Sequence, residues 1–183
     1  MNMKRFSIIS LLLWIGILAF ASGKPKVMWL DCSANFQRFS YPDSIRFYVD
    51  KCHEAGITHL VLDIKDNTGE VLYPSKYAAQ KKNWKNFDRP DFDFIGTFIE
   101  AAHARNMIFA GMNIFADGQN IVKRGAIFDK HKKWQAINYV PRKGLLPVTE
   151  IEGKPTMFLN PALKEVQKYE IDVIKEVVRN YAF

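Results

Sequence analysis

The sequence of 183 residues is poor in the residue patterns that hold metals or phosphates. It has only four histidines, at positions 53, 59, 103 and 131, and their spacing is not that of metal ligands. It also lacks a glycine-rich phosphate loop and the Gly-x-Ser-x-Gly turn of a serine nucleophile. We therefore expect neither a metal site nor a cofactor.

Cysteine is equally scarce, with one residue at position 32 and one at position 52. Cys32 ends the first predicted strand at its carboxyl end, whereas Cys52 lies near the end of the antiparallel helix that follows, at the opposite end of the sheet. A strand of six residues spans about 20 Å, and a disulfide needs Cα atoms within about 7 Å. We therefore predict two buried free thiols, even if the protein is exported.

A dense basic stripe is absent as well, although the formal net charge is +7. Lysine and arginine are dispersed along the chain, with at most short clusters such as Lys81 and Lys82. Nucleic-acid binding proteins concentrate such charge on one face. The sequence therefore does not favour a nucleic-acid partner.

One segment is strongly apolar, and it lies at the amino terminus. Lys4 and Arg5 precede an apolar run over residues 6–20, and the small residues Ala19 and Ala21 lie at its end. This order is typical of a signal peptide, which we assign to residues 1–23, with cleavage near Ala21 or Ser22. An uncleaved membrane anchor is the alternative. No later run is long enough to span a bilayer, so we expect a secreted or periplasmic protein without an integral membrane segment after cleavage.

The remaining residues, 24–183, read as one α/β domain. Short apolar runs at residues 27–32, 59–64 and 107–114 each precede a segment with helical spacing, at residues 43–54, at about 93–105, and from Asn160 and Pro161 onward. This βαβαβα order predicts a parallel sheet.

The connections are unequal in length. Those from helix to strand are short, while those from strand to helix run from about ten to more than forty residues. Long loops in barrels gather at the carboxyl ends of the strands and are usually functional. Within the last of them, residues 135–140 and 156–159 are strand-like and predict a hairpin.

Polar residues cluster at the predicted carboxyl ends of the strands. In the second strand Leu60, Leu62 and Ile64 share the face suited to the helices, so Asp63 and Lys65 should point together to the other side. The same parity places Trp29 and Asp31 on that side in the first strand, and Phe109, Gly111 and Asn113 in the third. We expect a binding or catalytic rim there. The alternative is that Asp63 and Lys65 only neutralise each other in a buried polar layer.

Aromatic residues are frequent in the same loops, including Tyr73, Trp84 and Trp134. Aromatic faces with a few polar groups suit a ring-shaped ligand such as a sugar. For any single one of these aromatic residues, packing in the core is the favoured interpretation, and the sugar hypothesis depends on their occurrence together.

Several segments together resemble the glycosyl-hydrolase-like family 10. They are Val-Met-Trp-Leu-Asp at residues 27–31, Ala-Gly-Ile-Thr before Leu-Val-Leu-Asp-Ile-Lys at residues 55–65, Tyr-Pro-Ser at residues 73–75, Phe-Asp at residues 87–88, Asp-Phe at residues 91–92, residues 100–107, Met-Asn-Ile-Phe at residues 112–115, and Phe-Leu-Asn-Pro at residues 158–161. The resemblance implies a TIM barrel of largely uncharacterised glycoside hydrolases that are common among secreted bacterial proteins. It also implies that Asp31, Lys65, Tyr73, Asn113 and Asn160 lie around the site.

The pattern of that family continues beyond Phe183 into a fourth strand that ends in an acidic residue. We therefore interpret the chain as the first three βα units of a (β/α)8 TIM barrel, truncated before strand 4, since such a barrel needs about 250 residues.

On this interpretation the chain is part of a secreted glycoside hydrolase that acts on an oligo- or polysaccharide and is inactive alone. Two carboxylates normally flank the glycosidic bond, and Asp63 and Asp31 are the ones we assign to catalysis. The residues that we assign to substrate binding are Lys65, Tyr73, Asn113, Asn160 and Trp134. A barrel protein that binds carbohydrate without cleaving it is the rival hypothesis.

Overall fold

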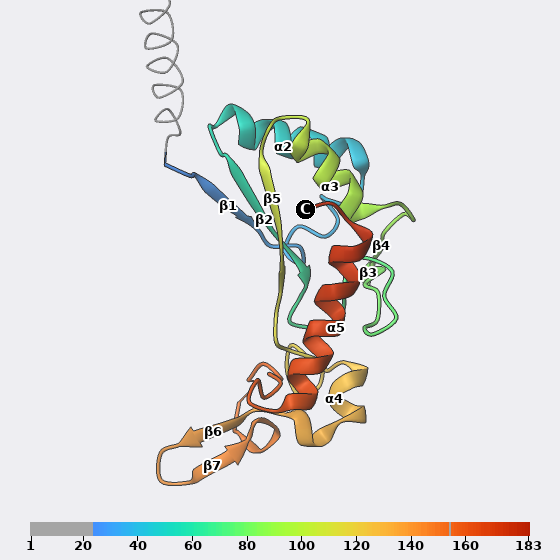
Figure 1. Cartoon of the computed structure of the whole chain (residues 1–183). Helices are drawn as coiled ribbons and strands as arrows, with labels where there is room; N and C mark the ends of the chain where they lie inside the picture. The colour runs from blue at the N-terminus through green and yellow to red at the C-terminus, as the bar shows by residue number, and fades with distance from the viewer. Residues whose placement is uncertain (1–23, 154) are drawn as a thin grey trace, which may run out of the picture.

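A parallel sheet of three strands forms the centre of the fold (Figure 1). The computed structural model describes residues 24–153 and 155–183, so the predicted signal peptide at residues 1–23 lies outside the described residues. The strands are β1 (Val27–Leu30), β2 (His59–Lys65) and β5 (Ile108–Asn113), in the spatial order β1-β2-β5. This confirms an α/β fold with a parallel sheet. The described part of the chain forms an open sheet rather than a closed barrel.

Helices α2 (Pro42–Glu54) and α3 (Phe94–His103) pack together beside this sheet (Figure 1). Each buries one apolar face, which includes Ile45 and Val49 in α2 and Phe98 in α3. The Asp93 carboxylate accepts a hydrogen bond of 2.9 Å from the Gly96 amide and so caps the first turn of α3. Both helices begin and end within two residues of the predicted positions.

The orientation of β5 differs from the expected one, which placed Phe109 and Gly111 on the same side as Asp63. Leu60 is the partner of Phe109, and Leu62 is the partner of Gly111. Residues paired in this way in a parallel sheet point to the same side. Phe109 and Gly111 therefore share the helix-covered face with the leucines, and the Phe109 ring stacks on Phe98 with centroids 6.0 Å apart.

The register also shifts by one residue within β2. Asp63 is the partner of Met112, yet Lys65 is the partner of Asn113, so one extra residue is accommodated in β2. Such a bulge interrupts the alternation of side chains along a strand. The expected common orientation of Asp63 and Lys65 therefore does not follow.

The loops after β2 and β5 contain short elements of their own. The first loop forms a small hairpin of β3 (Asn83–Trp84) and β4 (Phe87–Asp88). The second contains α4 (Ala126–Lys130), the 3-10 turns η1 (Lys132–Trp134) and η2 (Val148–Glu150), and the strands β6 (Ile137–Val140) and β7 (Gly144–Pro147).

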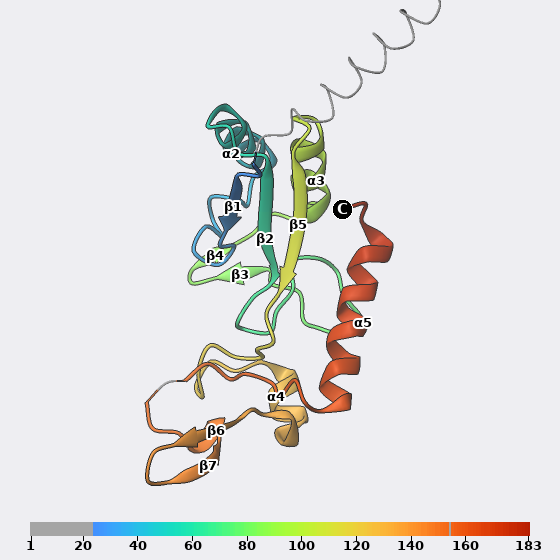
Figure 2. The same ribbon diagram turned by 60° about the vertical axis from the view of Figure 1, so that its left-hand side comes forward.

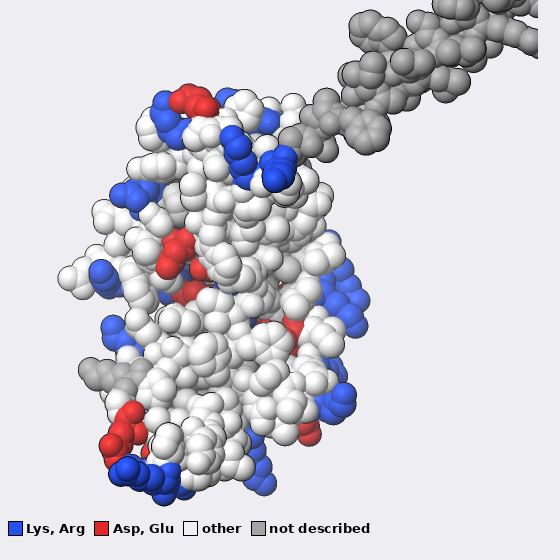
Figure 3. Space-filling model, turned by 90° about the vertical axis from the view of Figure 1, so that its left-hand side faces the viewer, with Lys and Arg blue, Asp and Glu red and all other residues white. Residues whose placement is uncertain are grey.

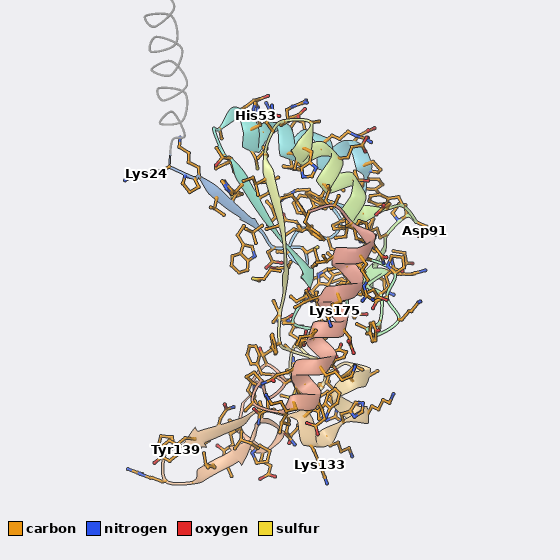
Figure 4. All side chains as sticks on the ribbon, in the orientation of Figure 1. Lys24, His53, Asp91, Lys133, Tyr139 and Lys175 are labelled. Atoms are coloured by element: carbon orange, nitrogen blue, oxygen red, sulfur yellow. The ribbon has the colours of Figure 1, made fainter. Side chains whose placement is uncertain are left out.

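The hairpin in the second loop pairs differently from the prediction. β6 pairs with β7 and not with residues 156–159, which make only isolated bridges. The hairpin projects away from the sheet, and Figure 4 shows Tyr139 on it.

Helix α5 (Lys164–Asn180) stands beside β5 and runs back toward α3 (Figure 2). It begins three residues after Pro161, the predicted first helical residue, because the Asn160 side chain accepts a hydrogen bond of 3.0 Å from Ala162 N and closes a turn ahead of the helix. Within the described residues, the longest helices are too short or too polar to cross a membrane. Cys32 and Cys52 are both free, as predicted; Cys32 is buried and Cys52 is half-buried.

Candidate functional site

The carboxyl ends of β1 and β2 form a rim whose central group is Asp63. Its side chain points to the same side of the sheet as Trp29, and Trp29 Nε1 donates a hydrogen bond of 2.9 Å to Asp63 Oδ1. Asp63 is 7% exposed, whereas Trp29 is 55% exposed. A sheltered carboxyl group thus lies beside an open aromatic surface, as the parity of β2 predicted.

The surroundings of Asp63 favour its protonated form. Burial is the main cause that raises the pKa of this carboxyl to about 6. The Trp29 hydrogen bond opposes this rise, and the negative charges of Asp31 and Asp66 add to it. A carboxyl with such a pKa can donate or accept a proton near neutral pH.

Asp31 is the exposed partner of Asp63 on this rim. Its Oδ1 accepts a hydrogen bond of 2.8 Å from Ala34 N, and its carbonyl oxygen accepts one of 2.8 Å from Asn35 Nδ2. These bonds hold the turn that follows β1. Figure 3 views the side of the molecule on which β1 lies. One group of acidic side chains lies near its middle, others lie at its upper and lower margins, and the basic side chains lie toward the margins.

A third carboxylate, Asp66, lies just after β2 and is almost completely buried. Its partner is Lys81, whose Nζ donates a hydrogen bond of 2.5 Å to Asp66 Oδ2. The hydroxyl groups of Ser33 and Thr68 donate to the same carboxylate. Burial alone would raise the pKa of Asp66, but the charge of Lys81 and these donors hold it below its ordinary value. At mildly acidic pH, Asp66 is therefore ionised while Asp63 still holds its proton.

Lys65 lies apart from Asp63 in a second buried group. Its side chain has no exposed surface, and its Nζ donates to Glu170 Oε1 at 3.1 Å, to the Ile114 carbonyl at 2.6 Å and to the Ala116 carbonyl at 3.0 Å. Lys65 thus joins β2 to α5. Among the described residues, Asp63 and Lys65 do not form an ion pair, which leaves the alternative of mutual neutralisation without support.

The other predicted site residues lie in different surroundings. Tyr73 is buried and donates a hydrogen bond of 3.3 Å from its hydroxyl to the Val173 carbonyl. Trp134 is half-buried, with His131 stacked on its ring at 3.9 Å between centroids. Asn160 is half-buried in the turn before α5, and its backbone N–H donates to the Trp134 carbonyl at 2.6 Å. None of these three lies on the β1–β2 rim.

Asn113 is unusual because both polar atoms of its side-chain amide are buried without a hydrogen-bond partner among the described residues. It lines a groove of about 390 Å³ between β5 and α5 that is otherwise mainly apolar. Buried amides are normally paired. The Asn113 amide is thus free to bind a further polar group.

Sequence reasoning missed Asp66, Lys81 and Glu170. Asp66 opens the turn-rich segment Asp-Asn-Thr-Gly directly after β2, which could have marked it as a residue at the carboxyl end of a strand. Lys81 was read with Lys82 as an ordinary basic cluster. Glu170 lies in α5, 105 residues from Lys65, and the pattern of the sequence carries no signal for their pairing.

Comparison with known proteins gives matches at several levels. The profile of the family described as glycosyl hydrolase-like 10 matches residues 26–183. A curated relative, an S-layer-related protein of Niallia circulans, is 28% identical over 173 residues, which are 88% of this chain and 11% of that protein. The chain thus spans about a tenth of the length of this relative.

Two solved structures resemble the fold. A hypothetical protein from Ruminiclostridium thermocellum has a TM-score of 0.54 at 19% identity, over 83% of this chain and 70% of that one. A glycoside hydrolase family 20 β-N-acetylglucosaminidase also has a TM-score of 0.54, at 18% identity, over 85% of this chain and 34% of that one. At these identities the likeness concerns the fold alone.

Proposed function

Because the chain belongs to the glycosyl hydrolase-like 10 family, we propose that its β1–β2 rim is part of a site that cleaves glycosidic bonds in an oligo- or polysaccharide. A carbohydrate-related function follows from the family, and the proposal adds the reaction. The observation that carries it is the state of Asp63, a sheltered carboxyl with a pKa of about 6 beside an exposed indole ring.

The chemistry of glycoside hydrolysis gives Asp63 and Asp31 different roles. One carboxylic acid protonates the leaving oxygen, and a second, ionised carboxylate acts as base or nucleophile. Asp63 is suited to the first role because it keeps its proton up to a higher pH than an ordinary aspartate. Asp31 is suited to the second because it is exposed and close enough for its charge to raise the pKa of Asp63.

The exposed Trp29 ring offers a surface for the sugar. Aromatic faces stack on the apolar faces of sugar rings, and the indole N–H of Trp29 is already used by Asp63. We further propose that the open sheet is the first part of a (β/α)8 barrel, with Trp29 and Asp63 on the side of its axis. The 55% exposure of Trp29 supports this, because further strands of a barrel would cover this large apolar side chain.

A carbohydrate-binding role without cleavage is the second candidate, and the bonding of Asp66 favours it. Both oxygens of Asp66 are occupied by donors, so this carboxylate has no free position for a reacting group. If Asp31 is also held by its own turn, the rim would bind a sugar through Trp29 and Asp63 and leave the glycosidic bond intact.

The experiment compares Asp63→Asn with Asp43→Asn, which alters a fully exposed aspartate of α2, with both variants made in a protein that carries the whole proposed barrel. Hydrolysis of 4-nitrophenyl glycosides, including the N-acetyl-β-glucosaminide, and retardation in gels that contain xylan or glycol chitin are measured for both. We expect Asp63→Asn to abolish turnover or retardation with little change in melting temperature, and Asp43→Asn to behave as the wild type. Retardation of the wild type without turnover would favour the binding role. Equal behaviour of the two variants would reject both roles.

We also propose that the protein is exported, on the evidence of Lys4, Arg5 and the apolar run that follows. Mass spectrometry of the protein recovered outside the cytoplasm should then give a new amino terminus near Ala21 or Ser22. An intact Met1 on that material would contradict cleavage.

A further inference from the structure

The buried ammonium group of Lys81 lies where three loop segments meet. Besides Asp66, its Nζ lies 3.5 Å from the Ser33 hydroxyl, which belongs to the turn after β1. It lies 3.4 Å from the Thr68 hydroxyl, in the loop after β2, and 4.1 Å from the centre of the Trp84 ring in β3. A lysine without exposed surface needs this number of partners, because burying an unpaired ammonium costs several kcal/mol.

The same contacts fix the charge of Asp66. Its Oδ1 accepts from the backbone and the hydroxyl of Thr68, at 2.9 and 2.5 Å. Its Oδ2 accepts from Ser33 and from Lys81. All four donors stabilise the carboxylate form, and Lys81 is the only ion among them. Glu70, at 3.7 Å from Lys81 Nζ, is the other carboxylate near the ammonium group, and it is partly exposed.

We propose that Lys81 is a positioning residue of the rim, which fixes Asp66 as a permanent negative charge next to Asp63 and holds the turn after β1 against the end of β2. The proposal rests on the function proposed above for Asp63. Ser33 is two residues from Asp31, so the contact with Ser33 also restrains the exposed carboxylate of the rim.

The pKa of Asp63 should respond to the loss of Lys81 in the direction opposite to the ordinary one. The titratable groups that act on Asp63 are Asp31 and Asp66, and Cys32 is close enough to respond to the charge of Asp63. Loss of a nearby positive charge ordinarily raises the pKa of a carboxyl. Here removal of the Lys81 charge would leave Asp66 buried without its ionic partner, so Asp66 would take up a proton. Its charge would then no longer raise the pKa of Asp63, which should fall.

The test follows the titration of Asp63 in the full chain, by the carboxyl carbon chemical shift assigned with Asp63→Asn. The variants are Lys81→Met, Lys81→Arg and Asp66→Asn, and the matched control is Lys82→Met, which removes the charge of the exposed neighbour. We expect the pKa of Asp63 to fall below about 6 in Lys81→Met and in Asp66→Asn, while burial keeps it above its ordinary value of 3.8. Lys81→Arg should restore much of the wild-type value, and Lys82→Met should leave it unchanged.

A pKa of Asp63 that stays constant or rises in Lys81→Met would overturn the proposal. If Lys81→Met does not fold, Asp66→Asn decides, because it removes the negative charge and keeps an acceptor for Lys81; an unchanged pKa there is equally contradictory. The readout needs no sugar. If the titration of Asp63 shifts in a protein that neither binds nor cleaves glycans, the proposed function is refuted and the role of Lys81 stands. If the protein binds glycans but the titration does not shift, the role of Lys81 is refuted and the proposed function stands.

Discussion

Trp29 and Asp63 are joined by a hydrogen bond of 2.9 Å between the indole N–H and Oδ1, across the neighbouring strands β1 and β2. Trp29 is opposite Val61 in the register, so its ring lies on the same side of the sheet as Asp63. The bond fixes the direction of one carboxylate oxygen and leaves the other directed away from the indole. It also favours the ionised form, which opposes the effect of burial on the pKa.

Replacement of Trp29 by phenylalanine should therefore raise the pKa of Asp63 above about 6. Phenylalanine keeps most of the apolar cover but removes the donor that stabilises the carboxylate, and a hydrogen bond to a charged group contributes about 1.5–3 kcal/mol. The titration of Asp63 followed by its carboxyl carbon shift measures this. Trp134→Phe, which changes a ring away from the rim, serves as the control. An unchanged or lowered pKa of Asp63 in Trp29→Phe would mean that the hydrogen bond does not stabilise the carboxylate in solution.

Asp117 should make the protein less stable at neutral pH than at mildly acidic pH. Burial raises the pKa of this carboxyl to about 6, against the hydrogen bond from the Phe128 amide that lowers it. The folded state therefore holds the proton between pH 3.8 and about 6 while the unfolded chain has released it. Protons bind preferentially to the folded state in this window, so stability falls as the pH rises through it.

The contribution of Asp117 amounts to roughly 2–3 kcal/mol, at about 1.4 kcal/mol for each pKa unit. Asp117→Asn should abolish it, because the amide remains neutral and can still accept from Phe128. Urea unfolding at pH 4, 5, 6 and 7 measures the slope. Asp63 acts in the same direction, so a reduced slope should remain. A variant with the slope of the wild type would show that Asp117 is ionised throughout.

Gly69 is expected to be intolerant of a side chain for two separate reasons. Its φ is +83°, and a Cβ atom there would lie 2.8 Å from the Cα of Asp117. Gly144 has nearly the same φ of +84° and no atom within 4 Å of such a Cβ. The pair therefore separates backbone strain from a steric clash.

We expect Gly144→Ala to lower the free energy of unfolding by about 1 kcal/mol, the cost of the left-handed conformation. Gly69→Ala should lower it by about 2–4 kcal/mol, because overpacking adds about 1–3 kcal/mol. Chemical denaturation of both variants at one pH measures the difference. Equal losses would show that the loop around Asp117 can move aside.

Much of the sheet could be predicted, because its evidence is local. The alternation of Leu60 and Leu62 with Val61 and Asp63 determines which side faces the helices, and both leucines are fully buried. Parity failed beyond Asp63, since a bulge leaves no mark in the pattern of apolar and polar residues. It also failed in β5, where the choice of Phe109 for the open face ignored its fit against Phe98.

The long loops were less predictable, because their partners are distant in sequence. A hairpin was predicted in the second loop, but its second strand was placed at residues 156–159. Arg142, with φ of +67°, and Gly144 close the turn so tightly that β7 starts at once. The burial of Lys81 depends on the carboxylate of Asp66, fifteen residues away. Neither composition nor residue spacing predicts this pairing.

The ion pair of Lys65 and Glu170 gives the last prediction, because it joins β2 to α5 in the interior with exposures of 0% and 1%. Glu170→Gln would leave the Lys65 ammonium with the two carbonyl oxygens as its strongest acceptors. Removing one partner of a buried pair costs about 3–5 kcal/mol. Asp172→Asn, which breaks the pair with the exposed Lys168 on the same helix, should cost at most about 1 kcal/mol.

The double variant Lys65→Met with Glu170→Met tests whether the pair itself stabilises the fold. Two methionines of similar volume remove both desolvation penalties, and such replacements are often neutral or stabilising. We therefore expect the double variant to recover most of the stability lost in Glu170→Gln, as measured by urea unfolding. If it remains as unstable as the single variant, the bonds from Lys65 to the Ile114 and Ala116 carbonyls hold the loop after β5, and the lysine is required for the fold even without its carboxylate.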